Sequence, residues 1–444
     1  MGNRLNRRQF VQLTGATGVA ALAGCAGQEA SSDGNSTADG ESADSPPDPT
    51  STDTALIEPE TLKEWQDAGL VNLEELDERE RVVVMRVWET DTYADGHVPG
   101  ALKWDATEFH AKRLEGLANA APLVPNGEQM DEILQRNGVC PRTTIVLSGP
   151  SALRTARAYW TLRYWGFPRE RVKILNGGYS GYEEAYELST GEEPEAPAAN
   201  FSVQANEERN GGDRLSMAQM LQRTDLKQAG DRDDVFLDNR PDPSTTIATA
   251  ISDDPANYIN GDGFKTKFSE GGTWLSADAI ESHIFGLDGV SDGDTIVTYC
   301  GSGYRATMGY FALDGIMGYD DVTVYDGSMG QWTDYDGNND AANTPPDTWR
   351  VDLSDRTNGD TGDSDLDILV DDPPALDTAA ANQIDVADAA YMSGDMSAYD
   401  DPVASAETTP KDGDGDGGGS DDGGGSDDSG GSDDSGGGSY GCSG

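Results

Sequence analysis

The stretch Thr295-Ile-Val-Thr-Tyr-Cys300-Gly-Ser-Gly-Tyr-Arg305-Ala-Thr-Met-Gly-Tyr-Phe311 decides the fold. A short run of β-type residues ends at Cys300, and two glycines and an arginine follow before helical spacing begins. This order predicts a thiol where a parallel strand gives way to a helix, and the N–H groups and helix dipole that converge there stabilise negative charge on sulfur. Gly301 and Gly303 are expected to let the chain curl tightly around the thiol. We therefore interpret Cys300 as a nucleophile in an anion cradle, rather than as a buried structural cysteine.

The same pattern occurs twice in the chain, which indicates an internal duplication. Three pairs of segments match: residues 144–160 with 295–311, 172–179 with 322–329, and 82–86 with 235–240. Each half reads as strand, long connection, strand, helix and strand, and the apolar strands are typical of a parallel sheet covered on both faces. The predicted fold class is α/β with two duplicated domains. Gly149 stands where the second copy has Cys300, so the first half would shape and close the site without a nucleophile of its own.

Composition divides the 444-residue chain into five parts. They are a signal peptide over 1–24, a flexible linker over 25–55, a first domain over 56–200, a second domain with Cys300 over 214–352, and an acidic low-complexity tail over 353–444. Within the tail some apolar pattern persists around 375–391, and from Lys411 the chain is a Gly-Ser-Asp repeat. Such a repeat cannot bury enough apolar surface to offset its ordering entropy.

Acidic residues dominate the composition, with a net charge of −52 and a pI near 4.1. This charge gives a solvated, self-repelling surface, and salt screens the repulsion. The pattern resembles that of proteins from salt-loving archaea. Because the net charge is negative, like that of nucleic acids, we expect no nucleic-acid partner. We also expect a monomer.

The N-terminus carries its own pattern. Arg7 and Arg8 precede a short, weakly apolar run, which resembles a twin-arginine (Tat) export signal. Leu22-Ala-Gly-Cys25 resembles a lipobox, which implies cleavage before Cys25 and lipid on its sulfur. We expect a protein anchored by lipid at the extracellular face of the cell membrane. The alternative is an unprocessed, disordered extension.

The four cysteines, Cys25, Cys140, Cys300 and Cys442, have the spacing of neither a zinc site nor a disulfide framework. Cys140 precedes a predicted strand and is interpreted as a packing residue. We expect no metal and no cofactor.

Several motifs together carry a resemblance to a known family. They are the loop from Cys300 to Arg305, Tyr325-Asp326-Gly-Ser328, Asp238-Asn-Arg240, and Gly96-His97-Val-Pro-Gly-Ala101. In this order the chain resembles the tandem-domain rhodaneses, the thiosulfate and 3-mercaptopyruvate sulfurtransferases. The resemblance implies two rhodanese-like domains, each a parallel sheet with helices on both faces, the first of them without a catalytic cysteine.

The resemblance also implies a reaction. Cys300 would take the outer sulfur of thiosulfate or 3-mercaptopyruvate as a persulfide, and cyanide or a thiol would remove it. The persulfide is large and anionic, so a ring of N–H groups at a helix N-terminus disperses its charge. The cradle residues would be Gly301, Ser302, Gly303, Tyr304 and Arg305.

The same resemblance suggests roles for residues around the loop. Arg240 is similar to the family's substrate-anion arginine, or it forms a structural ion pair with Asp238. Arg305 would pair with the anionic donor, or it ties the loop to carboxylates. Asp326 would brace the loop through hydrogen bonds.

Ser302 and His97 sit where the mercaptopyruvate branch has residues linked to the catalytic cysteine. His97 would therefore belong to a proton-handling network, or it stabilises a turn.

Two other functions compete with sulfur transfer. A Cys-dependent phosphatase also uses a cysteine and an arginine in a helix-capping loop, but its Cys-x5-Arg spacing is one residue longer than the Cys-x4-Arg spacing here. The shorter loop suits a single sulfur rather than a tetrahedral phosphate. A surface-tethered sulfur carrier, which holds a persulfide on Cys300 and passes it to a partner, is the second alternative.

Overall fold

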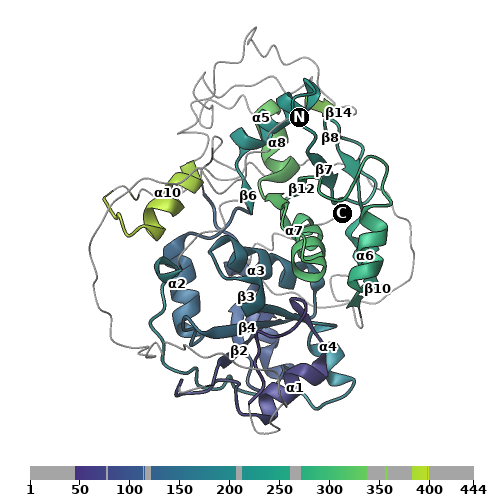
Figure 1. Cartoon of the computed structure of the whole chain (residues 1–444). Helices are drawn as coiled ribbons and strands as arrows, with labels where there is room; N and C mark the ends of the chain where they lie inside the picture. Colours follow the sequence, from purple (N-terminus) through teal and green to yellow (C-terminus); the bar gives the residue numbers. More distant parts are fainter. Residues whose placement is uncertain are drawn as a thin grey trace, which may run out of the picture.

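A computed structural model describes residues 46–76, 79–113, 115, 122–206, 213–260, 272–337, 356–358, 383–397 and 399. The expected signal peptide, Cys25, Cys442 and the Gly-Ser-Asp repeat lie outside these residues. Figure 1 shows two units, with α1 to α4 in its lower half and α5 to α8 in its upper half. Each unit is built around its own parallel sheet.

The two sheets have the same strand order, which confirms the duplication. The first sheet runs β1 (Leu56–Ile57), β5 (Val172–Leu175), β4 (Thr143–Ser148), β2 (Arg81–Trp88) and β3 (Leu102–Asp105). The second runs β6 (Arg214–Leu215), β13 (Val322–Tyr325), β12 (Ile296–Tyr299), β7 (Val235–Asp238) and β9 (Ile251–Ser252). Every neighbouring pair in both sheets is parallel. Each strand of one half thus has a counterpart at the same position in the other.

Helices cover both faces of each sheet, as the apolar strands predicted. The α-helices are α1 (Pro59–Asp67), α2 (Gly127–Arg136), α3 (Ala152–Tyr164), α4 (Gly178–Glu183), α5 (Met217–Gln228), α6 (Ala277–Ile284), α7 (Tyr304–Tyr310), α8 (Ser328–Gly337) and α10 (Gln383–Met392). Side chains alternate across a strand, and in β2 Val83 and Met85 belong to one apolar core while Val82 and Val84 belong to another. The strand is buried at all eight positions, and its apolar side chains therefore supply the cores on both faces of the sheet.

Short elements complete the two units. Four strands form the antiparallel pairs β10 (Ile259–Asn260) with β11 (Thr273–Trp274), and β8 (Thr246–Ile247) with β14 (Thr357–Asn358). The described residues also form the 3-10 helices η2 (Thr90–Asp95), η3 (Ala106–Glu108), η4 (Arg169–Arg171), η5 (Val203–Ala205) and η6 (Pro255–Tyr258), and a π-helix, η7 (Phe311–Met317), continues α7. In the described parts of the chain, no helix has the length and apolar character needed to cross a membrane.

The two domains meet where α3 packs against α7, side by side at the centre of Figure 1. Asp314 on η7 is buried and accepts hydrogen bonds from Tyr159 Oη at 2.6 Å, Arg163 Nε at 3.1 Å and Arg169 Nη2 at 2.9 Å. One apolar core runs through both domains and includes residues of α3 and α7. The domains are therefore joined by core packing and buried ion pairs.

Two outer segments are more ordered than their composition predicted. Ala55, at the end of the expected linker, is fully buried and donates to the Gly315 carbonyl at 2.8 Å. The expected tail over 353–444 contains α10, so a low-complexity tail is wrong for residues 383–397. Asp388 of α10 is fully buried and accepts both Arg113 Nη1 at 2.9 Å and Tyr164 Oη at 2.6 Å. The residual apolar pattern around 375–391 was the signal for this helix.

We expect Asp314→Asn to destabilise the protein by about 3–5 kcal/mol, because Arg163 would keep its buried positive charge without its carboxylate partner. Chemical denaturation measures this loss. Asp320→Asn is the matched control, because Asp320 also binds Arg169 but its side chain is 88% exposed. That exposed pair should contribute less than about 1 kcal/mol. Equal losses in the two variants would contradict the role assigned to the buried pair.

Candidate functional site

Cys300 lies directly after β12, at the carboxyl end of the second sheet, and α7 begins four residues later. The residue is 2% exposed. Its β12 neighbour Tyr299 is in register with Asp238 at the end of β7. The strand-to-helix position that the sequence predicted for this thiol is therefore the position it occupies in the structure.

Of the two loop glycines, only Gly303 is required by the geometry. Gly303 caps α7 with φ +79°, and a β-carbon there would lie 2.4 Å from the Asp326 carbonyl oxygen. Gly301 has no atom within 4 Å of the same position, and its backbone is outside the left-handed region. Tight curling of the loop thus depends on Gly303, while Gly301 leaves open space above the loop.

The start of α8 holds the cysteine loop in place. The Ser328 hydroxyl accepts the Cys300 N–H at 3.1 Å and donates to the Tyr325 carbonyl at 2.9 Å. The N–H groups of Met329 and Gly330 donate to the carbonyls of Cys300 at 3.0 Å and Gly301 at 2.8 Å. These four bonds fix the loop's backbone against the next strand-to-helix turn.

Asp326 was expected to brace the loop with its carboxylate, and the structure shows a different arrangement. The carboxylate is fully buried and accepts from the Val124 N–H at 3.0 Å and Arg214 Nε at 2.9 Å. Among the described contacts, the loop meets the main-chain carbonyl of Asp326, beside Gly303. The side chain therefore ties the second domain to the first, and Ser328 carries the bracing role.

Arg240 forms a bidentate ion pair with Asp238, with N···O distances of 2.8 and 2.6 Å. Its side chain is 20% exposed. Burial alone would lower the pKa of Arg240, but the bonds to Asp238 and the nearby Cys300 sulfur raise it. Of the two roles considered for Arg240, the structural ion pair with Asp238 is thus present. The guanidinium also lies at the same edge of the sheet as the Cys300 thiol.

Ser302 and Arg305 are both partly exposed on the loop and the first turn of α7. The structure does not bring His97 to them. His97 is 2% exposed, stacks on Tyr93 at 4.0 Å between ring centroids, and has Nδ1 3.1 Å from the Tyr93 carbonyl. Burial lowers the pKa of His97, and the charged groups acting on it all belong to the first domain. These contacts match the turn-stabilising role of His97 rather than a role in a proton-handling network.

Sequence reasoning missed a different histidine. His110 of the first domain has Nδ1 2.8 Å from the hydroxyl of Tyr304, the first residue of α7. Burial and the charges of Arg157, Arg154 and Lys112 lower the pKa of His110 to about 4, so it is neutral at pH 7. It sits in the long connection after β3, where no motif marks it. Its rarity, as one of three histidines in the chain, was the available signal.

A buried charge cluster lies behind Asp326 and joins the two domains. Arg214 makes two bonds to Glu115, at 2.9 and 2.7 Å, and also contacts Asp326 at 2.9 Å and Asp385 of α10 at 3.2 Å. Burial raises the pKa of the Glu115 carboxyl to about 7, although Arg214 acts in the opposite direction.

In the described part of the chain, no group of His, Cys, Asp and Glu is arranged to hold a metal ion.

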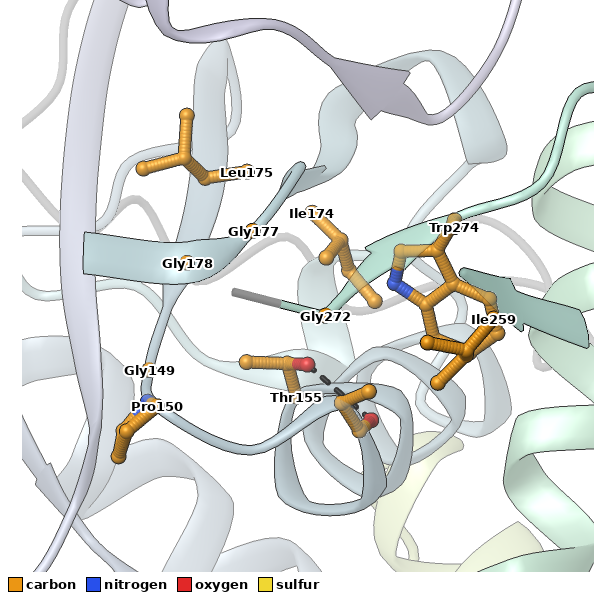
Figure 2. A pocket seen from close by; sticks show the side chains of 11 residues that line it. Gly149, Pro150, Thr155, Ile174, Leu175, Gly177, Gly178, Ile259, Gly272 and Trp274 are labelled. Carbon is orange, nitrogen blue, oxygen red and sulfur yellow. Dashed lines mark hydrogen bonds between the residues drawn. The ribbon is translucent and has the colours of Figure 1, made fainter. Parts of the chain in front are cut away.

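The corresponding loop of the first domain is closed. A β-carbon on Gly149 would lie 2.6 Å from the Val87 carbonyl oxygen, so the cysteine of the second copy does not fit there without a shift. Figure 2 shows a pocket of about 20 Å³ here, with Gly149 and Gly178 on one side and Trp274 and Ile259 of the second domain on the other. The Trp274 N–H donates to Asn176 Oδ1 at 2.9 Å. This space suits a water molecule rather than a substrate.

Fold and site together define a duplicated parallel α/β protein with a cysteine loop in its second copy. The rhodanese-like domain model matches residues 58–185 and 222–335, and the chain belongs to this family. Both matched ranges fall within the expected domains of 56–200 and 214–352.

The named relatives are distant in sequence, but each alignment covers most of the relative's length. The chain is 25% identical over 281 residues to a candidate thiosulfate sulfurtransferase of Haloferax volcanii, covering 61% of this chain and 91% of that protein. It is 28% identical over 246 residues to a candidate 3-mercaptopyruvate sulfurtransferase of Pseudomonas aeruginosa, covering 54% and 82%. A solved structure of an EanB variant with a cysteine persulfide and ergothioneine matches with a TM-score of 0.50 at 21% identity, covering 66% of this chain and 70% of that one. At this identity the structural match supports the fold alone.

Gly303→Ala should destabilise the second domain more than the same substitution at a left-handed glycine that has free space around it. Gly230, after α5, has nearly the same φ of +78° but no atom within 4 Å of a β-carbon, so Gly230→Ala isolates the backbone cost. We expect Gly303→Ala to be worse than Gly230→Ala by about 1–3 kcal/mol, the usual cost of overpacking. Chemical denaturation of both variants measures the difference, and similar losses would show that the contact with Asp326 is relaxed cheaply.

Proposed function

We propose that the protein is a sulfurtransferase that uses Cys300 as its sulfur-carrying residue. The donor is thiosulfate or 3-mercaptopyruvate, and the acceptor is cyanide or a thiol. The observation that carries the proposal is the position of Cys300 on the strand-to-helix loop of one rhodanese-like copy, next to Arg240, while the other copy has Gly149 in a closed loop. The names of the relatives agree with this reaction class.

In the proposed reaction the Cys300 thiolate attacks the outer sulfur of the donor. A new S–S bond forms, and the bond between that sulfur and the donor breaks, which releases sulfite from thiosulfate or the enolate of pyruvate from mercaptopyruvate. The acceptor then attacks the outer sulfur of the persulfide, takes it, and returns Cys300 as thiolate. No net oxidant or reductant is needed.

The surroundings of the thiol suit these steps. Both donors are anions, and Arg240 and Arg305 supply positive charge at the carboxyl edge of the sheet. Cys300 is 2% exposed, so an anionic persulfide would be held largely out of water, where nearby charges act strongly. Gly301 leaves open space above the loop for a small donor.

Incubation with either donor should raise the intact mass of the wild-type protein by about one sulfur atom, and Cys300→Ser should show no rise. Site-resolved mass spectrometry assigns the sulfur, and a label on Cys140 or Cys442 with Cys300 untouched would overturn the assignment. Steady-state assays at high salt with cyanide then compare kcat/KM for the two donors. Labelling of Cys300 without turnover would indicate the sulfur carrier instead.

We further propose that the protein is exported by the Tat route and held at the extracellular face of the cell membrane by lipid on Cys25. The supporting sequence features are Arg7-Arg8, the box Leu22-Ala-Gly-Cys25 and the polar segment that follows. A single lipid chain attaches a protein only marginally, so stable anchoring requires a second chain or a further contact.

Cell fractionation checks this location. The Cys25→Ala variant should move from the membrane to the medium, because it keeps the export signal but lacks the lipid. A double variant, Arg7→Lys with Arg8→Lys, should remain in the cytoplasm. Wild-type behaviour of both variants would mean that the N-terminus is only an extension.

A further inference from the structure

One arginine of the first domain differs from the other buried arginines described above. Arg157 on α3 is fully buried, and its Nε and Nη2 reach the carbonyls of Phe109 and Pro122 at 3.3 Å each. Its Nη1 is buried and has no hydrogen-bond partner among the described residues. Arg113, Arg163 and Arg214, by contrast, each bind a carboxylate. In the described part of the chain, no carboxylate pairs with Arg157.

The unpartnered end of Arg157 faces the cysteine loop across the domain boundary. Nη1 is 3.1 Å from the position that a β-carbon on Gly303 would take. The guanidinium carbon is 5.3 Å from the ring centre of Tyr304 and 4.6 Å from that of Trp160. Both of its hydrogen bonds are to the first domain, so its reach into the second domain ends at the loop that begins with Cys300.

A buried cation without a counter-ion is costly, because it has lost its hydration and gained only weak contacts. The two carbonyl bonds and two aromatic faces offset part of this cost. The remaining charge is compensated when an anion occupies the loop, since attraction is strong where water is excluded.

We infer that Arg157, supplied by the first domain, stabilises the anionic sulfur of Cys300 as thiolate and as persulfide through its fixed positive charge. The persulfide part rests on the proposed function, whereas the thiolate part does not. In the duplicated alignment the residue that matches Arg157 is Met308, which is fully buried. The first domain, which has no nucleophile, thus contributes a positive charge at a position where the second domain has an apolar side chain.

The charges around this pair are consistent with the inference. Burial lowers the pKa of Arg157, while negative charge on Asp326, Tyr304 or Cys300 raises it and Arg214 lowers it further. Asp326 is already bound to Arg214 and Val124, and Tyr304 is bound to neutral His110. Arg240, in the same domain as Cys300, also interacts with Cys300. Of these three groups, Cys300 is the one whose side chain makes no hydrogen bond among the described contacts, so we assign it to Arg157.

The test follows the alkylation of Cys300 by iodoacetamide as a function of pH, resolved by mass spectrometry. Arg157→Met gives the side chain of the repeat counterpart, and Arg157→Gln removes the charge but keeps an N–H donor for the carbonyls. In both, the midpoint of the profile should rise by at least about one pH unit, the scale of losing one nearby charge. Arg157→Lys keeps the charge and should stay near the wild-type midpoint. If alkylation is slow, the ultraviolet absorbance of the thiolate, measured against Cys300→Ser, follows the same titration.

Arg81→Met is the control for general damage to the first domain. Arg81 is also buried and held by carbonyls, those of Leu73, Gly138 and Glu74, but it lies at the amino end of β2, whereas Arg157 lies on the helix that follows the carboxyl end of β4. Its profile should match the wild type. An unchanged midpoint in a folded Arg157→Gln or Arg157→Met variant overturns the inference, as does an equal shift in Arg81→Met. A raised midpoint in a protein that transfers no sulfur would uphold the charge on the thiolate while the proposed function fails.

Discussion

The buried ion pairs between the two domains are the constraint on which the site depends. Asp314 with Arg163, and Arg214 with Glu115, join buried side chains that are far apart in sequence. Such pairs add little net stability compared with apolar packing, but breaking one leaves an uncompensated charge. They therefore define one relative placement of the domains. In this placement His110 and Arg157 of the first domain reach the loop after Cys300.

Much of the fold could be predicted from the sequence because its signals are local. Apolar runs such as β2 and β12 predicted a parallel sheet, and the duplication predicted the shared strand order. The thiol at the end of β12 was predictable because strand, glycine and helix signals follow one another there. Arg157, His110 and α10 were not, since each acts through a contact with a distant segment that no periodicity records. For His97 two roles were open from the sequence, and in the structure the ring packs on Tyr93 and contacts its carbonyl, as the turn-stabilising role requires.

The two copies show how one framework can carry different tasks. In the first copy the loop position is blocked by the Val87 carbonyl, and Trp274 of the other domain lies against it. In the second copy the corresponding loop passes close to the Asp326 carbonyl at left-handed Gly303, and the Ser328 hydroxyl accepts the Cys300 N–H. The difference arises from a few backbone contacts, while the strand order and the helix layers are unchanged.

The π-helix η7 has a consequence for how the helix after Cys300 is used. Successive residues of an α-helix are 100° apart, and a π turn holds an extra residue, which shifts the phase of everything beyond it. Before the shift, α7 packs on β12, β13 and α3. Within the π-helix, Asp314 and the Gly315 carbonyl accept hydrogen bonds from Tyr159 and Ala55 of the first domain. The helix that begins at the thiol loop therefore ends in a segment that is bonded to the first domain, so one continuous element connects the thiol loop with the domain contact.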